Sequence, residues 1–276
     1  LHYLYGANAA LAAIRSKKRT IYNVFNAEVH QESVTSKSIL AAARKSNLEV
    51  LRKSRNELDR MSLGKPHNNI VLSCSDLPRL LVQGLGDKDQ GWRPILANQD
   101  PMSASLALSG AEVDTPPVYV LLDEVTDPQN MGSILRSAYF LGCAGVVLSA
   151  RNCCSITPTV VKVSSGASEF VPILHADSVV SFIKQSRKNG WRCVATVGRE
   201  EAALLRVKNR LTEVKALKDR KTPVLLILGS EGSGLRTNVK AACTTLTSIA
   251  SPARIDTTVE SLNVGVAAAI LLHQLL

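Results

Sequence analysis

A single carboxylate, Glu231, lies within a glycine-rich loop that runs from Gly229 to Gly234. The apolar residues before this loop, 225–228, predict a buried strand. Glycines permit positive φ angles and let a ligand approach the backbone closely, and open α/β sheets bind ligands at the carboxyl ends of their strands. The loop is therefore a candidate binding site, although an ordinary strand-to-helix turn would have a similar composition.

The residues around the glycine loop argue against two common nucleotide sites. Gly234 is followed by Leu235 and Arg236, whereas a P-loop needs Lys and then Ser or Thr at this place. The G-x-G-x-x-G fingerprint of dinucleotide-binding folds is also absent. Nucleoside triphosphates and NAD therefore lose their main support as ligands.

Two further pairs of polar residues could take part in the same chemistry. Asn130 begins an amphipathic stretch to Leu141 and can cap that predicted helix, while Arg136 lies on its polar side. Ser261 and Asn263 precede the apolar run 264–272, where either could be an N-cap or could hold a substrate by hydrogen bonds. A lone helical arginine is usually a solvated charge, but Arg136 lies in the second turn of a helix that follows directly from a strand-end loop.

The sequence offers little support for a hydrolase or a metalloenzyme. No Ser-His-Asp order, no H-E-x-x-H motif and no paired general-acid carboxylates stand out, and the histidines are scattered. The six cysteines lack metal-binding spacing. We therefore expect no metal site, and a reduced intracellular compartment that could be an organellar matrix.

Strands and helices alternate from residue 116 to the end. This alternation predicts a mostly parallel sheet that is covered on both faces, with its functional site at the carboxyl ends of the strands. The expected strands are 118–122, 145–148, 171–174, 193–197 and 224–228, and the expected helices are 130–141 and 179–188.

Residues 1–85 predict a smaller α/β domain, and residues 86–115 predict a linker rich in glycine and proline. The small domain is expected to contain a helix at 6–14, strands at 21–25, 48–51 and 70–72, a helix at 39–44 that is capped by Ser36, and a short helix at 55–61. Residues 116–276 then form the second domain.

The charge distribution favours a polyanionic partner such as RNA. The net charge is +10. Residues 1–85 carry 13 basic and 6 acidic groups, the linker carries 2 and 5, and residues 116–276 carry 18 and 12. Two basic domains therefore flank an acidic connector, which suits RNA binding, although charge for general solubility would look alike.

The ends of the chain and its apolar tract bear on location. The chain begins at Leu1 without Met, so we expect a trimmed segment whose targeting presequence, if it has one, is not included. The longest apolar tract, 264–272, is much shorter than a membrane span and predicts a buried helix. No membrane partner is expected.

Taken together, the three polar segments resemble the motifs of the SpoU (TrmH-type) RNA ribose 2′-O-methyltransferases of the SPOUT superfamily. The resemblance rests on Asn130 to Arg136, on Gly229 to Leu235 and on Ser261 to Ala267, in this order and in this strand context. It extends to Leu4-Tyr5-Gly6, which is similar to the start of the family's L30e-like substrate-binding domain, and to residues 152–158 and 164–167. The linker is not covered.

Two departures from the family pattern are local. Asn68 and Asn69 stand where many members have Gln-Gly, and Asn69 can replace a left-handed glycine. Gly265 stands where serine is common, which we expect to be a small change on a buried helix.

The resemblance implies an α/β chain with an N-terminal L30e-like domain and a C-terminal SPOUT domain that contains a deep trefoil knot and dimerises. S-adenosyl-L-methionine would be the cofactor, bound in the knot. The matching cofactor-binding positions are Gly229, Ile249 and Leu262, through backbone groups, together with Gly234, Ala267 and Thr196. Arg136, Glu231, Ser261 and Asn263 would surround the reacting ribose, and Asn130 would hold the loop. No metal is required.

The long stretch between Ile249 and Ser261 is similar to the mitochondrial branch of the family, which makes 2′-O-methylguanosine in large-subunit ribosomal RNA. This resemblance implies a ribosomal RNA partner and the mitochondrial matrix. A transfer RNA methyltransferase, or a non-catalytic RNA-binding factor for ribosome assembly on the same scaffold, remain as alternatives. For the mechanism, we expect Arg136 to bind the adjacent phosphate and to stabilise the developing alkoxide, because a guanidinium is a poor general base.

Overall fold

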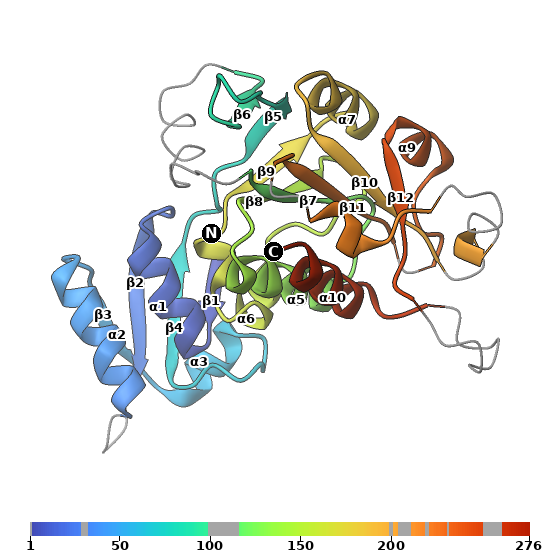
Figure 1. Ribbon diagram of the computed structural model, residues 1–276. Coiled ribbons are helices and arrows are strands. Elements are labelled where there is room, and N and C mark those ends of the chain that lie inside the picture. The colour runs from blue at the N-terminus through green and yellow to red at the C-terminus, as the bar shows by residue number, and fades with distance from the viewer. Residues whose placement is uncertain are drawn as a thin grey trace. The chain divides into compact units, whose positions relative to one another are not determined.

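The computed structural model describes residues 2–28, 33–98, 116–198, 201–203, 211–218, 221–230, 232–250 and 261–276. The chain divides into two compact units (Figure 1). Unit 1 contains Leu1–Pro78 and Ser155–Phe170, and unit 2 contains Arg79–Cys154 and Val171–Leu276. Among the helices of the described ranges, none has the length and apolar character that a membrane span requires.

Unit 1 is built on a four-stranded sheet with the order β1-β4-β2-β3. Apolar residues of its strands and helices form the core, including Leu4, Ile39 and Leu72, each with no exposed surface. The strands are β1 (His2–Tyr5), β2 (Ile21–Ala27), β3 (Val50–Lys53) and β4 (Ile70–Cys74), and the helices from this part of the chain are α1 (Ala7–Ser16), α2 (Val34–Lys45) and α3 (Arg55–Met61).

Side-chain caps fix the starts of two of these helices. Ser54 and Glu57 form a capping box at α3. Helix α2 is capped by Ser33, which accepts a hydrogen bond from the backbone N–H of Ser36. The prediction of Ser36 as the cap was therefore wrong by one turn. Ser33 and Ser36 are the same residue type, so the sequence alone does not show which of them caps the helix. Asn69 has a φ of 63°, which confirms the expected left-handed turn.

Residues 155–170 pack in unit 1, although they lie between two strands of unit 2 in the sequence. They form α6 (Pro158–Val163) and the short helix η1 (Ala167–Glu169). The Arg19 guanidinium donates to both carboxylate oxygens of Glu169, at 3.0 and 3.1 Å, with both side chains fully buried. Burial raises the pKa of Glu169, and the charge of Arg19 opposes that rise. The compact units therefore differ from the expected continuous domain at 116–276.

Unit 2 is built on an eight-stranded sheet with the order β12-β10-β11-β7-β8-β9-β5-β6. All neighbouring strands are parallel except β5 and β6. The strands are β5 (Leu80–Leu85), β6 (Pro94–Leu96), β7 (Val118–Leu122), β8 (Gly145–Ser149), β9 (Ile173–Ala176), β10 (Arg192–Thr196), β11 (Val224–Leu228) and β12 (Thr245–Thr247).

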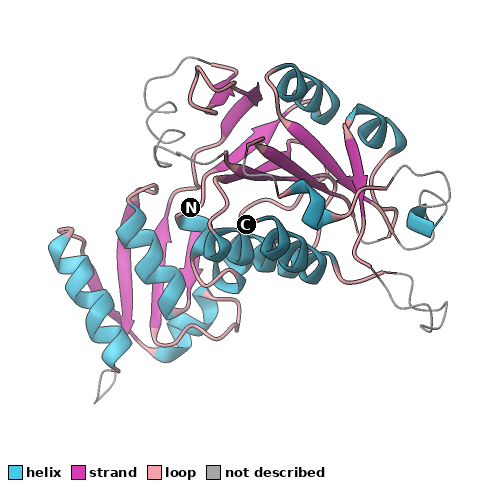
Figure 2. Cartoon of the chain, viewed as in Figure 1, coloured by secondary structure: helices cyan, strands magenta, loops and turns pink. Residues whose placement is uncertain are grey.

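Helices cover both faces of the large sheet (Figure 2). On one face lie α5 (Pro128–Leu141) and α10 (Val264–Leu275), which pack against each other. On the other face lie α7 (Val179–Lys188) and α9 (Thr237–Ala242), which also pack together. Because both faces are covered, the central strands β7, β8 and β11 are buried throughout. The trefoil knot stays a prediction.

The segment that the sequence assigned to a linker contains ordered structure. Strand β6 pairs antiparallel with β5, and the Trp92 ring meets the edge of Trp191 with ring centroids 5.8 Å apart. The indole N–H of Trp191 donates to the carbonyl of Gly86 at 2.7 Å. Glycine and proline in this region shape a hairpin at the sheet edge, which their composition alone does not distinguish from a linker. Residues 99–115 lie outside the described ranges.

Candidate functional site

Three predicted cofactor-binding positions lie at one edge of the large sheet, where β10, β11 and β12 end. Thr196, the last residue of β10, pairs with Thr247 of β12 and donates from Oγ1 to the carbonyl of Ile227 at 3.1 Å. Gly229 follows β11 directly, and Ile249 lies two residues beyond β12. Parallel pairing therefore places the strand ends next to Thr196, Gly229 and Ile249 at the same edge of the sheet.

The glycine loop turns back tightly on itself. A Cβ atom at Gly229 would lie 2.5 Å from both the carbonyl carbon and the oxygen of Gly234, so only glycine fits there. The Gly234 N–H donates to the carbonyl of Ser230 at 3.1 Å, and the hydroxyls of Ser230 and Ser233 are 2.7 Å apart. Gly234 has a φ of 64°. Glu231, the predicted carboxylate of this loop, lies outside the described residues.

A charged pair that sequence reasoning missed holds the end of this loop. Arg236 donates to both carboxylate oxygens of Asp123, from Nε at 3.1 Å and from Nη2 at 2.7 Å. The Asp123 carboxylate is buried, with 1% of its side chain exposed, and it follows β7. This hydrogen bond raises the pKa of Arg236 further. The sequence held one signal for this pair: an acidic and a basic residue lie after two apolar strands that were both predicted.

The first and third motifs meet through two amide side chains. Asn263 donates from Nδ2 to Oδ1 of Asn130 at 2.8 Å. Its own Oδ1 accepts hydrogen bonds from the backbone N–H groups of Gly265 and Val266 and so caps α10. One side chain thus fixes the start of α10 and joins it to α5.

The predicted capping role of Asn130 was wrong. Asp127 caps α5, because its carboxylate accepts from the backbone N–H groups of Gln129 and Asn130. Asn130 lies in the first turn and is 93% buried, at 7% exposure. Its side chain is therefore free to bind Asn263 across the helix pair.

The other predicted site residues lie on solvent-facing surfaces around these two helices. Arg136 on α5 is exposed, and within the described residues its guanidinium makes no hydrogen bond or ion pair. Ser261 and Leu262 precede α10 and are exposed, and Ala267 lies in its first turns with partial exposure. No direct hydrogen bond joins Arg136 to another predicted site residue in the described ranges. The structure therefore places this arginine on the same helix as Asn130 but leaves it available.

Close packing of α5 on α10 depends on a second glycine. A Cβ atom at Gly265 would meet the hydroxyl of Ser133, which itself donates to the carbonyl of Asn130 at 3.0 Å. The expectation that serine at this position is a small change needs correction, since any side chain there requires Ser133 to move.

The edge formed by β10, β11 and β12 suits a cofactor such as S-adenosylmethionine. The hydroxyl of Ser248, just after β12, is buried and has no hydrogen-bond partner among the described residues. The glycine loop adds exposed backbone at Gly232 and Gly234, and Thr196 at the end of β10 adds a hydroxyl. Backbone groups, hydroxyls and the apolar Ile249 can bind an adenosine and an amino-acid chain without charged ligands. Among the described residues, no group of His, Cys, Asp or Glu could hold a metal ion.

The SpoU rRNA methylase family matches residues 117–273, and the description "RNA 2′-O ribose methyltransferase substrate binding" matches residues 3–80. The chain belongs to the SpoU rRNA methylase family. This assignment confirms the resemblance that the three motifs carried. The two matched regions follow each other in the order that the motifs predicted, with the substrate-binding region first.

Individual relatives agree with this assignment. The chain is 31% identical to human mitochondrial rRNA methyltransferase 1, over 100% of this chain and 72% of the relative. It is 29% identical to a 23S rRNA (guanosine-2′-O-)-methyltransferase from Coxiella burnetii, over 98% of this chain and 93% of the relative. The crystal structure of an AdoMet-bound rRNA methyltransferase from Sinorhizobium meliloti has a TM-score of 0.70 and 18% identity, over 99% of this chain and 86% of that one. This likeness concerns the fold, and it confirms the predicted fold class.

Proposed function

We propose that this protein methylates the 2′-oxygen of a guanosine ribose in mitochondrial large-subunit ribosomal RNA. It is an S-adenosylmethionine-dependent rRNA methyltransferase, as its family and its named relatives support. The structural observation that carries the proposal is the Asn263–Asn130 hydrogen bond. It joins the first and third motifs within the unit that also presents the glycine loop.

S-adenosylmethionine supplies an electrophilic methyl group on a sulfonium. When bound, the cofactor would present this methyl group to the ribose, and transfer would replace the S–CH₃ bond with an O–CH₃ bond as the 2′-hydroxyl loses its proton. The backbone of Gly229, Ile249 and Leu262, with Thr196, Gly234 and Ala267 nearby, would hold the cofactor. Positioning of two reactants can contribute ~7–11 kcal/mol to catalysis, so orientation by the protein is a large part of the mechanism.

Arg136 acts on the RNA side of the reaction. Its exposed guanidinium is available to bind the phosphate next to the target ribose and to stabilise the negative charge that develops on the 2′-oxygen. A guanidinium has a pKa above about 12 and holds its proton. The proton of the 2′-hydroxyl would therefore pass to solvent water, while Arg136 supplies charge.

Ser261, Asn263 and Glu231 orient the target nucleotide in this proposal. Asn263 is held by its two roles, as the cap of α10 and as the donor to Asn130. Ser261 lies two residues before it and is exposed to an incoming ribose. Asn130 supports the site from a buried position by fixing the direction of the Asn263 amide.

Residues 1–85 would bind the RNA substrate, and residues 116–276 would bind the cofactor, catalyse transfer and dimerise, with 86–115 between them. The match of residues 3–80 to the substrate-binding family and the +7 charge of residues 1–85 support the first part. RNA binding through backbone phosphates should weaken steeply as salt concentration rises.

Exposed apolar side chains on the paired helices support a homodimer. Phe140 and Tyr139 at the end of α5 are 86% and 49% exposed, and Val266 on α10 is 50% exposed. Apolar surface of this kind marks interaction sites in soluble proteins. A second copy of the chain would cover it, and sedimentation equilibrium of the wild type and of Phe140→Asp would test this interface.

The mitochondrial matrix is the proposed location. The name of the human relative supports a mitochondrial protein, and the matrix is where mitochondrial ribosomal RNA is found. Imaging of the full-length tagged protein, with protease protection of isolated mitoplasts, would test the compartment.

A transfer assay tests the proposed function. Purified protein, cofactor with a labelled methyl group, and transcripts of mitochondrial large-subunit rRNA and of transfer RNA would be combined. We expect label in the large-subunit rRNA, recovered after nuclease digestion as 2′-O-methylguanosine. Label on a base, label in transfer RNA alone, or no label at all would contradict the proposal.

A further inference from the structure

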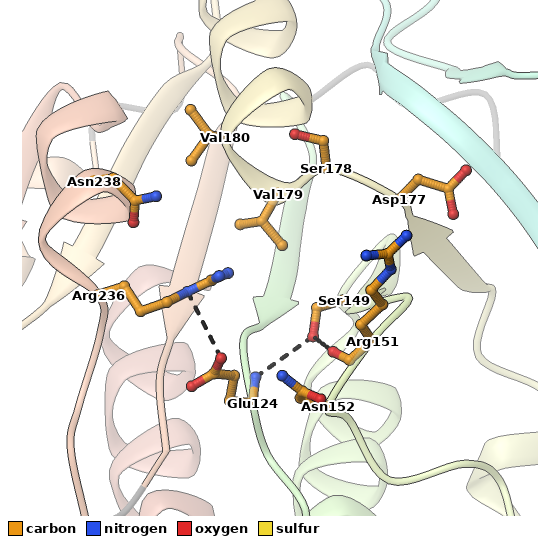
Figure 3. A pocket seen from close by; sticks show the side chains of 10 residues that line it. All are labelled: Glu124, Ser149, Arg151, Asn152, Asp177, Ser178, Val179, Val180, Arg236 and Asn238. Carbon is orange, nitrogen blue, oxygen red and sulfur yellow. Dashed lines mark hydrogen bonds and ion pairs between the residues drawn. The ribbon is translucent and has the colours of Figure 1, made fainter.

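A polar pocket lies at the carboxyl ends of β7, β8 and β9, next to the start of α9 (Figure 3). Its volume is about 510 Å³, within the ~300–1,000 Å³ typical of small-molecule sites. Its polar lining comes from three strand-end loops and from the start of α9, and it includes Glu124, Ser149, Arg151, Asn152, Asp177, Arg236 and Asn238.

Hydrogen bonds fix the floor of this pocket. The Ser149 hydroxyl donates to the carbonyl of Arg151 at 2.9 Å and accepts from the Glu124 N–H at 3.5 Å. Glu124 and Asn152 have left-handed φ angles of 62° and 57°. These contacts join the loops after β7 and β8, so the pocket does not depend on a single loop.

One cation of the pocket is already matched, and another is available. Arg236 lies against Asp123 and is 3.8 Å from the Glu124 carboxylate, so acidic neighbours balance its charge. Arg151 is exposed, and its guanidinium makes no hydrogen bond or ion pair with any residue that the structure describes. In the described part of the chain the amides of Asn152 and Asn238 also lack a side-chain partner. The pocket thus presents one guanidinium and two amides to a ligand.

This set of groups suits an unpaired nucleotide. A guanidinium binds a phosphate or the O6/N7 edge of guanine, while amides both donate to and accept from base edges. The carboxylate of Asp177 can accept from amino and imino groups of a base. Val179 and Val180 add an apolar wall for the face of the base. Sequence-specific RNA recognition uses unstacked bases in this way.

The pocket shares structure with the methyl-transfer site. Its wall includes Arg236, which lies two residues after the glycine loop, and Glu124, which belongs to the loop between β7 and Asn130. We infer that this pocket binds one unpaired nucleotide of the RNA substrate, other than the nucleotide that is methylated. This inference rests on the proposed function, and it assigns part of substrate selection to unit 2.

The test compares Arg151→Gln with Lys188→Gln. Lys188 is an exposed cation at the end of α7 and does not line the pocket, so its variant removes the same charge from the same unit. We expect Arg151→Gln to raise the dissociation constant for the large-subunit rRNA transcript about tenfold, and Lys188→Gln to change it less than about twofold. The slope of log affinity against log salt, which is negative, should become shallower by about 0.7 for one lost phosphate contact on a single strand. Cofactor affinity should be unchanged.

A second measurement addresses the site directly. Transcripts that contain 4-thiouridine would be photocrosslinked to the wild type, and the modified peptides would be identified. We expect crosslinks within residues 149–152 or 177–180. Equal RNA affinity of the two variants, together with no crosslink in these ranges, would overturn the inference. If the wild type still transferred methyl groups to the RNA, the proposed function would stand without it.

Two further outcomes would also overturn it. If guanosine monophosphate or inorganic phosphate binds the wild type but not Arg151→Gln, and RNA affinity is the same in both, the pocket is a site for a free small molecule. If the wild type transfers no methyl group to any RNA, the proposed function fails, and the inference fails with it.

Discussion

The side-chain amide of Asn263 donates a hydrogen bond to the side-chain oxygen of Asn130 over 2.8 Å, although the two residues lie far apart in the sequence. The same Asn263 caps α10. Formation of the site and the start of this helix therefore depend on one residue. A substitution at Asn263 can be chosen to remove one role and keep the other.

Asn263→Ser should keep the cap and lose the bond to Asn130, because a serine hydroxyl can cap a helix but is too short to replace the amide. Asn263→Ala should lose both. We expect the serine variant to lower the free energy of unfolding by ~1 kcal/mol and the alanine variant by ~2 kcal/mol, measured by denaturant titration. Methyl transfer should fall strongly in both. Full activity of Asn263→Ser would show that the bond to Asn130 does not support the site.

Gly229→Ala should damage the proposed cofactor site, because the new Cβ atom would lie 2.5 Å from backbone atoms of Gly234. Overpacking of this kind costs ~1–3 kcal/mol, so cofactor affinity should fall about tenfold or more in calorimetric titration. Gly232→Ala is the matched control, since a Cβ atom at Gly232 meets nothing within 4 Å. Equal losses in both variants would argue against a tight turn at Gly229.

The pair of Asp123 and Arg236 should contribute to stability through its two hydrogen bonds. Arg236→Gln leaves the buried Asp123 carboxylate without its bidentate partner, which should lower the free energy of unfolding by ~1–3 kcal/mol. The loss should lie toward the lower end of this range because the Arg236 side chain is partly exposed to solvent. The double variant Asp123→Asn/Arg236→Gln should lose less than the sum of the single variants. A double-mutant cycle measured by urea unfolding would reveal this coupling, and additive losses would contradict it.

His175 predicts a pH dependence of stability. Burial, with a smaller effect of Arg79, lowers the pKa of His175 to about 4. In the unfolded chain its pKa is near 6.5, so between these values the unfolded state binds more protons and stability falls as the pH falls. The free energy of unfolding therefore carries no penalty from protonation of His175 above about pH 6.5. Wild-type Tm should drop more than that of His175→Asn between pH 7 and pH 5, and parallel curves would exclude His175 as a cause.

Strong local patterns allowed much of unit 2 to be predicted. The strands 118–122 and 224–228 and the helix 179–188 have the expected bounds. The strands are apolar runs between turn residues, and the helix starts after Ser178, which caps it. Residue identity alone is less informative where several polar residues compete. Asp127 and Asn130 can both accept hydrogen bonds from the backbone N–H groups at a helix start, so the sequence does not show which of them is the cap. In the structure Asp127 caps α5, and Asn130 is buried in its first turn.

Long-range pairing explains most of what the sequence did not predict. Strand β12 has three residues, and β6 lies in a stretch rich in glycine and proline, so neither has a sustained pattern. The packing of residues 155–170 in unit 1 includes the buried Arg19–Glu169 pair and the core residue Val161, which contact residues far apart in the chain. The Asp123–Arg236 pair is of the same kind. The three motifs could be identified, but the contacts between them required the fold.

Arg136→Ala should abolish methyl transfer and leave cofactor affinity nearly unchanged, because Arg136 is exposed and acts on the RNA side of the proposed site. Calorimetry and the labelled-transfer assay would check both effects. Arg136→Lys should recover little activity, since an ammonium lacks the planar fork that binds phosphate at two points. A fully active alanine variant would remove Arg136 from the mechanism.

The most direct test of the central claim is to map ribose methylation in mitochondrial RNA from cells that lack this protein. Loss of the protein should remove 2′-O-methylation at a guanosine of the large-subunit rRNA, and the wild-type gene should restore it while the Arg136→Ala gene should not. Unchanged methylation of that RNA, or loss of a methyl group from transfer RNA alone, would contradict the account.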